Sequence, residues 1–307
     1  MYYKDRPLDK RRPEMKFPPT RYLRPVVLDQ ALDALNQYKG SIKVLAGGQS
    51  LLPLMAMRLA DPDILLDIND LAELQEIRDW ENCVEIGALI RHQRLIDDPV
   101  IQQHAPVLPL VARHIGHLAI RHRGTIGGSL VHCDPAAELP LAVQALDGEM
   151  LVQSVGQTRI LPAGKFFLSY LMSAVEPHEM LTAIRIPKLM AHTRFAFDEV
   201  AGRTGDFALV SALAIVTLDD DASIQVARLA IGGVSEVPFR VYEAEQYLTD
   251  AKLTPEVIDG AASIVHQAVN PEGDLHASAN YRRHLAGVLT SRVLTRVGVK
   301  GDLSWNR

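Results

Sequence analysis

Two glycine-containing stretches carry the residue types best suited to holding a ligand. The first, from Val44 to Pro53, reads VLAGGQSLLP: a short apolar run, two glycines, a polar pair and a helix-like start. Glycines let a backbone approach another molecule, and the first turn of a helix offers unpaired N–H groups to an anion. Gln49 and Ser50 can add side-chain hydrogen bonds, Ser50 as the N-cap. The stretch predicts a phosphate or pyrophosphate site, although a simple glycine turn between a strand and a helix would look the same.

The second stretch, from Arg123 to Ser129, reads RGTIGGS and also precedes an apolar run. The first stretch does not match the dinucleotide fingerprint G-x-G-x-x-G, because its glycines are adjacent and no third one follows at the required place. The presence of two such turns in one chain favours a different arrangement. We expect two loops that close on one extended phosphate ligand.

Three histidines, His114, His117 and His122, could suggest a metal site. The first two would lie one turn apart if residues 108–120 form a helix, as their apolar spacing predicts. A structural zinc site needs four ligands in a closed shell, and the arginines at positions 113, 121 and 123 would repel a cation. We therefore expect ordinary polar histidines and no metal ligands.

The stretch from His132 to Glu138 offers two further possibilities. His132, Cys133 and Asp134 could suggest a Cys–His nucleophile, but adjacent residues rarely face each other and no base with an orienting partner is evident. Asp134 and Glu138 straddle a helix start, where the dipole favours carboxylates, or they accept hydrogen bonds from ribityl or ribose hydroxyls. Farther along, Phe207 is either a core residue or a ring that covers a flat heterocycle.

Composition limits the class of protein. The chain has 307 residues, 48% of them hydrophobic and 22% charged, which is enough for an ample core in about two domains. A formal net charge of -5 indicates no general affinity for nucleic acid. The 2 cysteines exclude a disulfide scaffold and an iron–sulfur cluster bound by this chain alone, and they fit a reducing, cytoplasmic compartment. The N-terminus lacks a signal-peptide pattern, and the longest apolar run, Phe207–Leu218, is too short for a membrane span.

Apolar spacing and turn residues predict alternating helices and strands in the first part of the chain. We expect helices at 28–38, 51–59, 108–120 and 136–146, a further helix beginning at 91, and strands at 42–46, 64–68, 84–88, 149–153, 158–161 and 180–186. The opening order of helix, strand, helix and strand is typical of a small α/β layer.

Residues 187–192 form the predicted boundary between two domains. Beyond it, strands at 193–200, 208–218 and 224–231 predict a three-stranded antiparallel sheet, and helices are expected at 240–248, 255–269 and 281–297. Residues 1–14 are charged, contain proline and lack periodicity, so we expect a disordered extension. The predicted domains are 15–190 and 191–307.

Several motifs together resemble a known family. AGGQSLLP at 46–53 and TIGGS at 125–129 resemble the paired flavin motifs of the FAD-binding medium subunit of molybdenum hydroxylases, the type found in aerobic carbon monoxide dehydrogenase and in the flavin domain of xanthine dehydrogenase. Similar sequence continues at DPAAE (134–138), EMLTAIRIP (179–187), GDFA (205–208) and YR (281–282). The resemblance runs from about Met15 to near the C-terminus.

The resemblance implies an α+β protein with a PCMH-type FAD-binding fold of two α+β subdomains, followed by the three-stranded sheet and a helical bundle. It implies that Ala46–Ser50 holds the pyrophosphate, that Thr125–Ser129 lines the ribityl and pyrophosphate region, and that Phe207 lies against the isoalloxazine. No catalytic side chain is expected. The implied FAD-binding set is Leu45, Ala46, Gly47, Gly48, Gln49, Ser50, Leu51, Ile115, Thr125, Ile126, Gly127, Gly128, Ser129, Asp134, Glu138, Leu181 and Phe207.

The resemblance also implies a function, that of an oxidoreductase subunit that transfers electrons. Its FAD would take electrons from 2Fe-2S clusters on a small partner subunit and pass them to an external acceptor. Substrate oxidation would occur at a molybdenum cofactor on a large partner subunit, within a heterotrimer or a dimer of heterotrimers. The alternatives are a stand-alone flavin oxidase or reductase of the same fold and a flavin-free scaffold subunit. The substrate and the acceptor stay open.

The chain departs from the pattern of the family at three places. Ser129 stands where many relatives have Asn, and Glu138 where many have Asp. Both residues keep a hydrogen-bonding group, so FAD binding is expected to survive. The cysteine-containing loop that holds an extra iron–sulfur cluster in the flavin subunit of 4-hydroxybenzoyl-CoA reductase is absent, which disfavours that activity.

Overall fold

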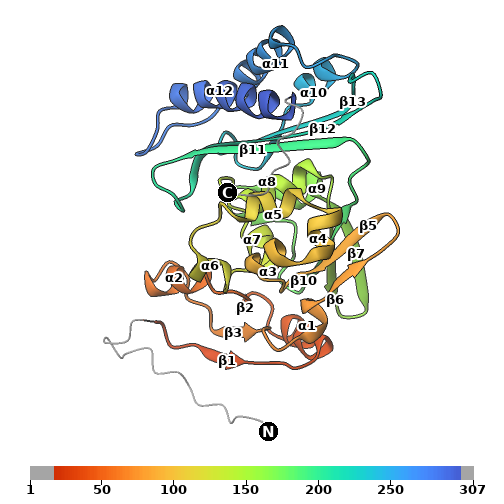
Figure 1. The fold of residues 1–307 in the computed structure, drawn as a ribbon. Helices are drawn as coiled ribbons and strands as arrows, with labels where there is room; N and C mark the ends of the chain where they lie inside the picture. The colour runs from red at the N-terminus through yellow and green to blue at the C-terminus, as the bar shows by residue number, and fades with distance from the viewer. Residues whose placement is uncertain (1–16, 299–307) are drawn as a thin grey trace.

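The computed structural model describes residues 17–298. The predicted N-terminal extension, residues 1–14, therefore lies outside the described residues. The chain forms three stacked layers of α and β structure, from the parallel sheet near the N-terminus to the helices near the C-terminus (Figure 1).

The first layer is a parallel sheet that places two loops at one edge. It consists of β1 (Arg21–Leu23), β2 (Ile42–Leu45) and β3 (Ile64–Asp67), in the order β1-β3-β2. α1 (Leu28–Gln37) buries its apolar stripe in the same core. Because β2 and β3 are parallel, the loop between β2 and α2 (Leu51–Ala56) lies beside the residues that follow β3.

The second layer is a five-stranded antiparallel sheet in the order β4-β5-β10-β6-β7. Its strands are β4 (Ile77–Asp79), β5 (Cys83–Gly87), β6 (Glu149–Ser154), β7 (Gln157–Pro162) and β10 (Met180–Pro187), and the 3-10 turn η1 (Ala72–Gln75) precedes it. A hairpin of β8 (Phe167–Ser169) and β9 (Met172–Ser173) adds a short pair. The helices that share its core are α3 (His92–Asp97), α4 (Pro99–His104), α5 (Val107–Ala112), α7 (Ile126–His132), α8 (Glu138–Ala145) and α9 (Ala163–Phe166). The short helix α6 (Leu118–Arg121) has no buried residue.

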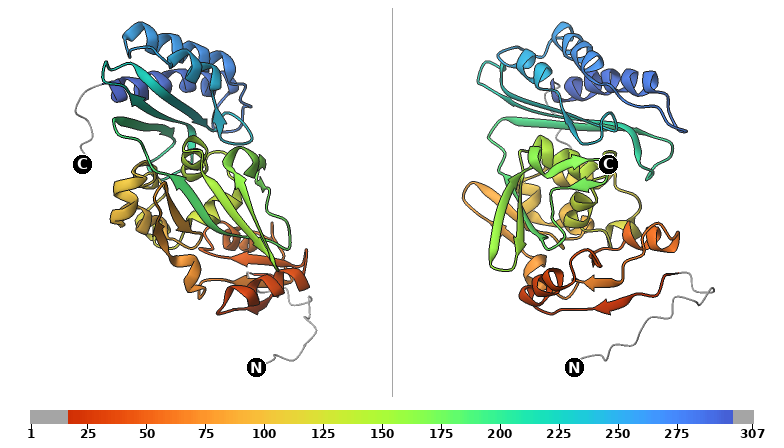
Figure 2. Two further views of the ribbon diagram at one scale, coloured as in Figure 1. Left: turned by 90° about the vertical axis from the view of Figure 1, so that its right-hand side faces the viewer. Right: turned by 180° about the vertical axis from the view of Figure 1, so that it is seen from behind.

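The third layer is an antiparallel sheet with helices on both faces. β11 (Thr193–Ala201), β12 (Ala208–Leu218), β13 (Ile224–Gly232) and β14 (Phe239–Arg240) lie in that order. α8 contributes to the core on one face, and α10 (Tyr242–Leu248), α11 (Pro255–Ala268) and α12 (Ala279–Gly298) to that on the other, as Figure 2 shows. Burial on both faces explains why β12 is almost entirely apolar, with Ser211 and Thr217 as its polar residues.

The α+β fold predicted from the sequence is confirmed, and three local predictions are wrong. The expected helix at 108–120 breaks into α5 and α6, because Gly116 adopts a positive φ of 43° between them. The three-stranded sheet has a fourth strand of two residues, β14. Ser50 is the N-cap residue of α2 by position, but its side chain makes no capping hydrogen bond.

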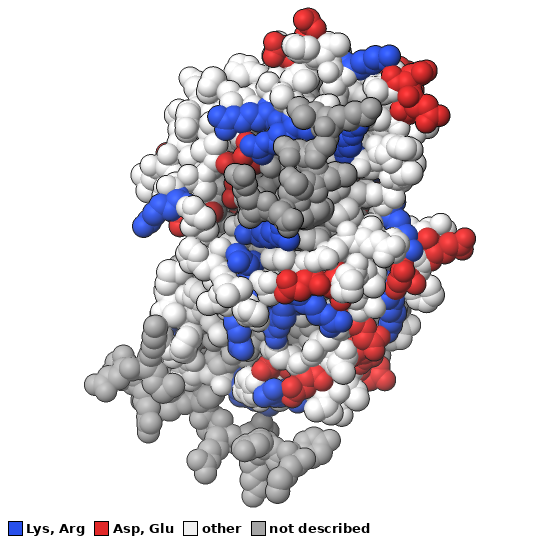
Figure 3. Space-filling view, viewed as in Figure 1, with Lys and Arg blue, Asp and Glu red and all other residues white. Residues whose placement is uncertain are grey.

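Charges are mixed on the face seen in Figure 3, where basic and acidic side chains alternate and uncharged surface lies between them. Within residues 17–298, no helix is both long and apolar enough to cross a lipid bilayer. The same described residues contain no group of three or more histidine, cysteine or acidic side chains arranged to bind a metal ion.

Candidate cofactor-binding site

The loop between β2 and α2 leaves a run of backbone donors free. Within the described chain, the backbone N–H groups of residues 47–51 donate no hydrogen bond. Gly48 has a φ of 74°, a conformation that glycine adopts without steric cost. The Gln49 side chain donates back to the Gly47 carbonyl over 3.1 Å and so closes the turn. Successive unpaired N–H groups in such a turn form a concave site for an anion.

The second glycine loop differs, because the N–H groups of residues 126–129 already donate hydrogen bonds within the protein. Thr125 caps α7 by accepting a hydrogen bond from the Gly128 N–H at 3.1 Å. The N–H groups of Ile126 and Gly127 bond to the Ile90 and Ala88 carbonyls at 3.0 and 2.9 Å. Among the described hydrogen bonds, residues 126–129 of this loop thus have no free N–H group, whereas residues 47–51 do.

The two loops touch through their glycines. A Cβ on Gly47 would meet the Arg123 carbonyl oxygen and would lie 2.9 Å from the Gly124 Cα, so only glycine fits there. A Cβ on Gly128 would lie 2.8 Å from the Thr125 Oγ1, with the next neighbour, the Ala46 Cβ, at 4.0 Å. Gly128 is also exposed, so its surface is open to a ligand.

A polar clamp that the sequence analysis missed joins the same loops. Asn69 donates to the Ala46 carbonyl over 2.9 Å, and the Arg91 guanidinium donates to the Asn69 Oδ1 over 2.6 Å. Arg91 also donates to the Arg123 carbonyl. Asp67 accepts from the Asn69 amide over 2.6 Å and from the Tyr22 hydroxyl. The signal was the polar sequence Asp67–Asp70 at the end of a buried parallel strand, where side chains meet a neighbouring loop.

The clamp contains one cation and one ionised carboxylate. Burial, and then the charge of Arg123, lower the pKa of Arg91, which nevertheless stays a cation at neutral pH because an arginine starts so far above it. Burial alone would raise the pKa of Asp67, but hydrogen bonds from Tyr22 and Asn69 outweigh it, and the pKa lies below its usual range. Asp67 is thus an ionised anchor for Asn69.

His92 packs against the second glycine loop at Gly124. Its side chain is only 6% exposed, and neither ring nitrogen has a hydrogen-bond partner among residues 17–298. A Cβ on Gly124 would lie 2.7 Å from the ring, and the His92 N–H bonds to the Gly124 carbonyl at 3.0 Å. Burial lowers the pKa of His92 to about 4, against a smaller opposing effect of the Thr125 backbone, so the ring is neutral at physiological pH.

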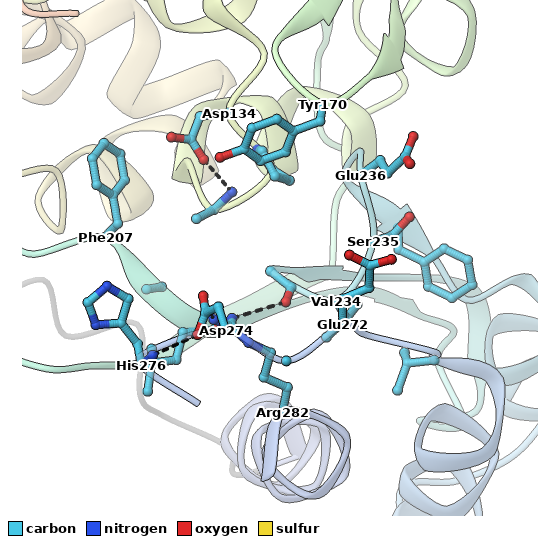
Figure 4. Close-up of a pocket in the computed structure, with 18 of the residues that line it drawn as sticks. Asp134, Tyr170, Phe207, Val234, Ser235, Glu236, Glu272, Asp274, His276 and Arg282 are labelled. Carbon is cyan, nitrogen blue, oxygen red and sulfur yellow. Dashed lines mark hydrogen bonds and ion pairs between the residues drawn. The ribbon is translucent and has the colours of Figure 1, made fainter. Parts of the chain in front are cut away.

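A cavity of about 940 Å³ opens at the other end of α7, between the second and third layers. Figure 4 shows Asp134 and Tyr170 on one side of it, Asp274 and Arg282 on the other, and Phe207 at one end. Phe207 is 64% exposed, so it is not the core residue that one interpretation predicted. Since α7 has 7 residues, about 10 Å separates this cavity from the glycine loops.

Glu138 and Asp134 have different environments. Asp134 is half-buried at the cavity, where its carboxylate accepts from the Ala136 N–H over 2.9 Å. Glu138 is 5% exposed, and burial raises its pKa to about 7. The nearby Glu199 raises it further, while His114 opposes the shift. The Nδ1 of His114 lies within hydrogen-bonding distance of the Glu199 Oε1, at 3.1 Å.

The predicted residues divide into those at the surface of the site and those in the core. Most of the residues at the surface are half-buried: Leu45, Ala46, Gly48, Ser50 and Leu51 around the first loop, Ser129 in the second, and Ile115 at the break after α5. Gln49 is exposed. Ile126 and Leu181 are buried in the second-layer core, Leu181 beside a β-bulge, so their side chains pack there. Cys133 is 1% exposed, and burial raises the pKa of its thiol, which leaves it a poor nucleophile.

Comparison with known families accounts for this geometry. Residues 15–189 match the model described as the FAD binding domain in molybdopterin dehydrogenase, and residues 195–297 match the CO dehydrogenase flavoprotein C-terminal domain. The chain belongs to this family. It is an FAD-binding medium subunit of the molybdenum hydroxylase family, and its activity is that of an oxidoreductase.

Individual relatives align with nearly the whole length of this chain. The chain is 37% identical to the alpha subunit of the 6-hydroxypseudooxynicotine dehydrogenase complex of Paenarthrobacter nicotinovorans, over 92% of this chain and 95% of that one. It is 35% identical to the nicotine 6-hydroxylase medium subunit of the same organism, over 93% and 100%. The solved carbon monoxide dehydrogenase of Hydrogenophaga pseudoflava superimposes with a TM-score of 0.89 at 32% identity, covering 92% and 98%.

The residues present fit FAD. Residues 47–51 offer an unpaired set of donors for the two negatively charged phosphates, and Gly128 leaves a surface that any side chain would fill. The second glycine loop lies at the N-terminal end of α7 and the cavity lined by Asp134 and Phe207 near its C-terminal end, an arrangement that suits an extended dinucleotide.

Proposed function

We propose that this chain is the electron-transfer subunit of a molybdenum hydroxylase, taking electrons from 2Fe-2S clusters of a small partner subunit and delivering them to an external acceptor. Bound FAD would supply the chemistry that joins one-electron carriers to a two-electron acceptor. The observation that carries the proposal is the free run of N–H groups at residues 47–51 beside Gly128.

The chain's own residues have binding roles in this proposal. Residues 47–51 hold the pyrophosphate, and Thr125–Ser129 shape the wall along which the ribityl chain passes. Asp134, which lines the cavity, contacts the ribityl part of the ligand, and Phe207 covers the ring. By resemblance to the family, Glu138 would lie beside the same part of the ligand. No side chain of this subunit acts as an acid or base on the substrate.

The cysteine content fits a division of labour between subunits. The chain has 2 cysteines, one of them buried, which is too few for a 2Fe-2S cluster with about four thiolate ligands. As the membership of the family implies, the proposal places the clusters and the molybdenum cofactor on a small and a large partner subunit, in a heterotrimer or a dimer of heterotrimers in the cytoplasm. The predicted division at residues 190 and 191 is kept as part of this proposal.

The substrate is chosen outside this chain. Relatives named for nicotine, caffeine, glyceraldehyde and carbon monoxide share its length and are 32–35% identical to it. Substrates so different cannot be recognised by one shared flavin fold, so the large subunit makes the selection. The choice of electron acceptor, in contrast, depends on the flavin site of this chain.

The test is a visible absorption spectrum of the protein purified from its native host with its partners attached. Flavin peaks with iron–sulfur shoulders, and two co-purifying chains, are the expected result. A flavin spectrum from a single chain that turns over a substrate would support a self-contained flavoenzyme instead. A folded chain without flavin would support the scaffold alternative.

A further inference from the structure

Arg282 is a buried arginine at the wall of the cavity and is not among the residues assigned to FAD binding. It belongs to the sequence pair YR at 281–282 and lies in the first turn of α12. Its side chain lines the cavity, and the residue is only 8% exposed. A cation removed from water is costly unless its N–H groups find acceptors. The partners of this guanidinium therefore indicate which parts of the chain it holds in place.

The guanidinium joins three segments that line the same cavity. Its Nη1 donates to the Leu209 carbonyl at the start of β12 and to the Gly233 carbonyl after β13, the latter over 3.3 Å. Its Nη2 donates to the Asp274 carboxylate over 2.7 Å, and Figure 4 shows Arg282 and Asp274 at this wall. Leu209, Gly233 and Asp274 all belong to the cavity lining. One side chain thus connects the segments that form the third-layer wall.

The two carbonyl groups lie where the sheet no longer supplies a donor. The ladder between β12 and β13 ends at the pair of Ser211 and Gly232, so Leu209 and Gly233 lie just beyond it. Gly233 has a φ of 75°, and a Cβ there would meet the Leu209 carbonyl oxygen. Backbone acceptors shielded from water need a partner, and Arg282 provides one for both. The arginine therefore keeps the two strands together past their last shared hydrogen bonds.

Asp274 fixes the third segment, the turn between α11 and α12. Its Oδ1 accepts from the backbone N–H groups of His276 and Ala277, over 2.8 and 2.9 Å, as an aspartate does in a tight turn. Its Oδ2 accepts from Arg282. Because Asp274 and His276 line the cavity, this turn is held at the wall by one ion pair.

Phe207 depends on the same backbone, because its side chain has little packing of its own. The ring is 64% exposed, and the residue directly precedes β12, two positions before Leu209. On the other side of Phe207, Gly205 packs on His117, where a Cβ would lie 2.8 Å from the ring. The position of Phe207 is thus set by the contact at Gly205 and by the hydrogen bond of Arg282 at Leu209.

We propose that Arg282 is a positioning residue of the flavin site, which fixes Phe207 over the ring through the backbone of residues 207–209. This inference rests on the proposed FAD site and adds to it the residue that holds its third-layer wall. Loss of the guanidinium should leave the phosphate-binding N–H groups of residues 47–51 in place and loosen the cover of the ring.

The experiment measures three properties of full-chain variants: the Kd for FAD, the visible circular dichroism of the bound flavin and the melting temperature. Arg282→Lys keeps the charge but loses the planar fork that reaches three acceptors. We expect a Kd about 2–12-fold higher, the range that one aromatic stack supplies, and a change in the flavin band of the same sign as in Phe207→Ala. Asp274→Asn keeps the acceptor of the turn and removes only the ion pair, so it should cause a smaller change of the same kind.

The matched control is Arg296→Lys on the same helix. Arg296 also donates to a backbone carbonyl and a carboxylate, those of Phe197 and Asp198, each over 3.1 Å, but it is not among the residues that line the cavity. This variant should keep the wild-type Kd and flavin spectrum, whatever its melting temperature. The double variant Arg282→Lys with Phe207→Ala tests the route, since it should bind FAD no more weakly than Phe207→Ala alone.

The outcomes separate this inference from the proposed function. A lowered melting temperature in Arg282→Lys with an unchanged Kd and flavin spectrum would assign Arg282 a structural role only and overturn the proposal. Additive losses in the double variant would overturn it as well, because Arg282 would then act by a route other than Phe207. If Arg282→Lys does not fold, Asp274→Asn decides by the same criteria. Failure of the wild type to bind FAD would contradict the proposed function itself.

Discussion

Gly47 packs directly on Gly124, with no space for a side chain between them: a Cβ on Gly47 would lie 2.9 Å from the Gly124 Cα. This contact joins the two glycine loops, which are far apart in the sequence. The side chains of Asn69 and Arg91 hold the same two loops: Asn69 donates to the Ala46 carbonyl, and Arg91 donates to the Arg123 carbonyl and to Asn69. The loop carbonyls are thereby occupied by the protein, and the N–H groups of residues 47–51 stay available to a ligand.

Substitutions at the glycines should separate ligand binding from folding. Gly128→Val should reduce FAD occupancy by at least about tenfold with a small loss of stability, on the order of the 1 kcal/mol of a helix cap, because its Cβ crowds only Thr125. Gly47→Val should lower both FAD occupancy and stability, because its Cβ would push apart the backbones of the two loops. Flavin content and thermal melting measure the two effects. Gly164→Ala, with its nearest neighbour at 3.8 Å, is the control. Full occupancy in Gly128→Val would refute the assignment of this surface to the ligand.

Removing the Arg91 side chain should weaken FAD binding without unfolding the protein. Arg91→Ala releases the Arg123 carbonyl and leaves the Asn69 Oδ1 unpaired, so we expect an FAD Kd roughly 10–100-fold higher, from the loss of one or two charge-assisted hydrogen bonds. Arg94→Ala is a matched control on the same helix, since Arg94 contacts Gln75 and Asp98 instead. Equal Kd values for the two variants would show that the clamp does not position the loops.

His92 should make the protein less stable in acid. The folded state has a pKa of about 4 for this ring and the unfolded chain about 6.5, so the unfolded state binds more protons between these values. The contribution to stability therefore rises with pH through that window, on the order of 1 kcal/mol per unit, and is complete above it. Glu138, whose folded pKa is raised to about 7, acts in the opposite direction from about pH 4.5 upward.

The comparison of variants isolates the His92 contribution. Urea unfolding of the wild type and His92→Leu at pH 4.5 and 6.5 should show a smaller pH effect in the variant, with exposed His266→Leu on α11 as the control. If His92→Leu kept the full wild-type difference, the ring would not be the group that titrates.

Phe207→Ala should change the flavin more than the fold. Phe207 is 64% exposed, so its removal should alter stability by no more than about 0.5 kcal/mol while it shifts the flavin absorbance or midpoint potential. Phe197→Ala removes a ring that is 4% exposed, and should cost about 3–5 kcal/mol. A lowered melting temperature with an unchanged flavin spectrum in Phe207→Ala would assign Phe207 a packing role only.

Local patterns predicted most of the elements because each has a clear periodicity. The alternation in β11 and the apolar run of β12 predicted their sheet, and the stripe of Ala31, Leu32 and Leu35 predicted α1. The helix expected at 108–120 fails at Gly116, where the apolar spacing continues but the backbone turns to a positive φ.

The candidate site was only partly predictable, because its support comes from contacts between distant segments. The glycine motifs mark the loops, but nothing local shows that Asn69 and Arg91 meet across 22 residues to hold them. His92 was likewise invisible, since its burial depends on the packing of Gly124. The sequence also assigned phosphate contacts to both loops, whereas the hydrogen bonds reserve the free donors for residues 47–51.

The most direct test of the account compares the Kd values of the full chain for FAD and for riboflavin, which lacks the phosphates and the adenosine, with riboflavin phosphate as the compound that restores one phosphate alone. If residues 47–51 hold the pyrophosphate, several charge-assisted hydrogen bonds of about 1.5–3 kcal/mol each should make FAD at least about 100-fold tighter than riboflavin. Equal Kd values would contradict the account, because the free N–H groups would then have no phosphate to bind.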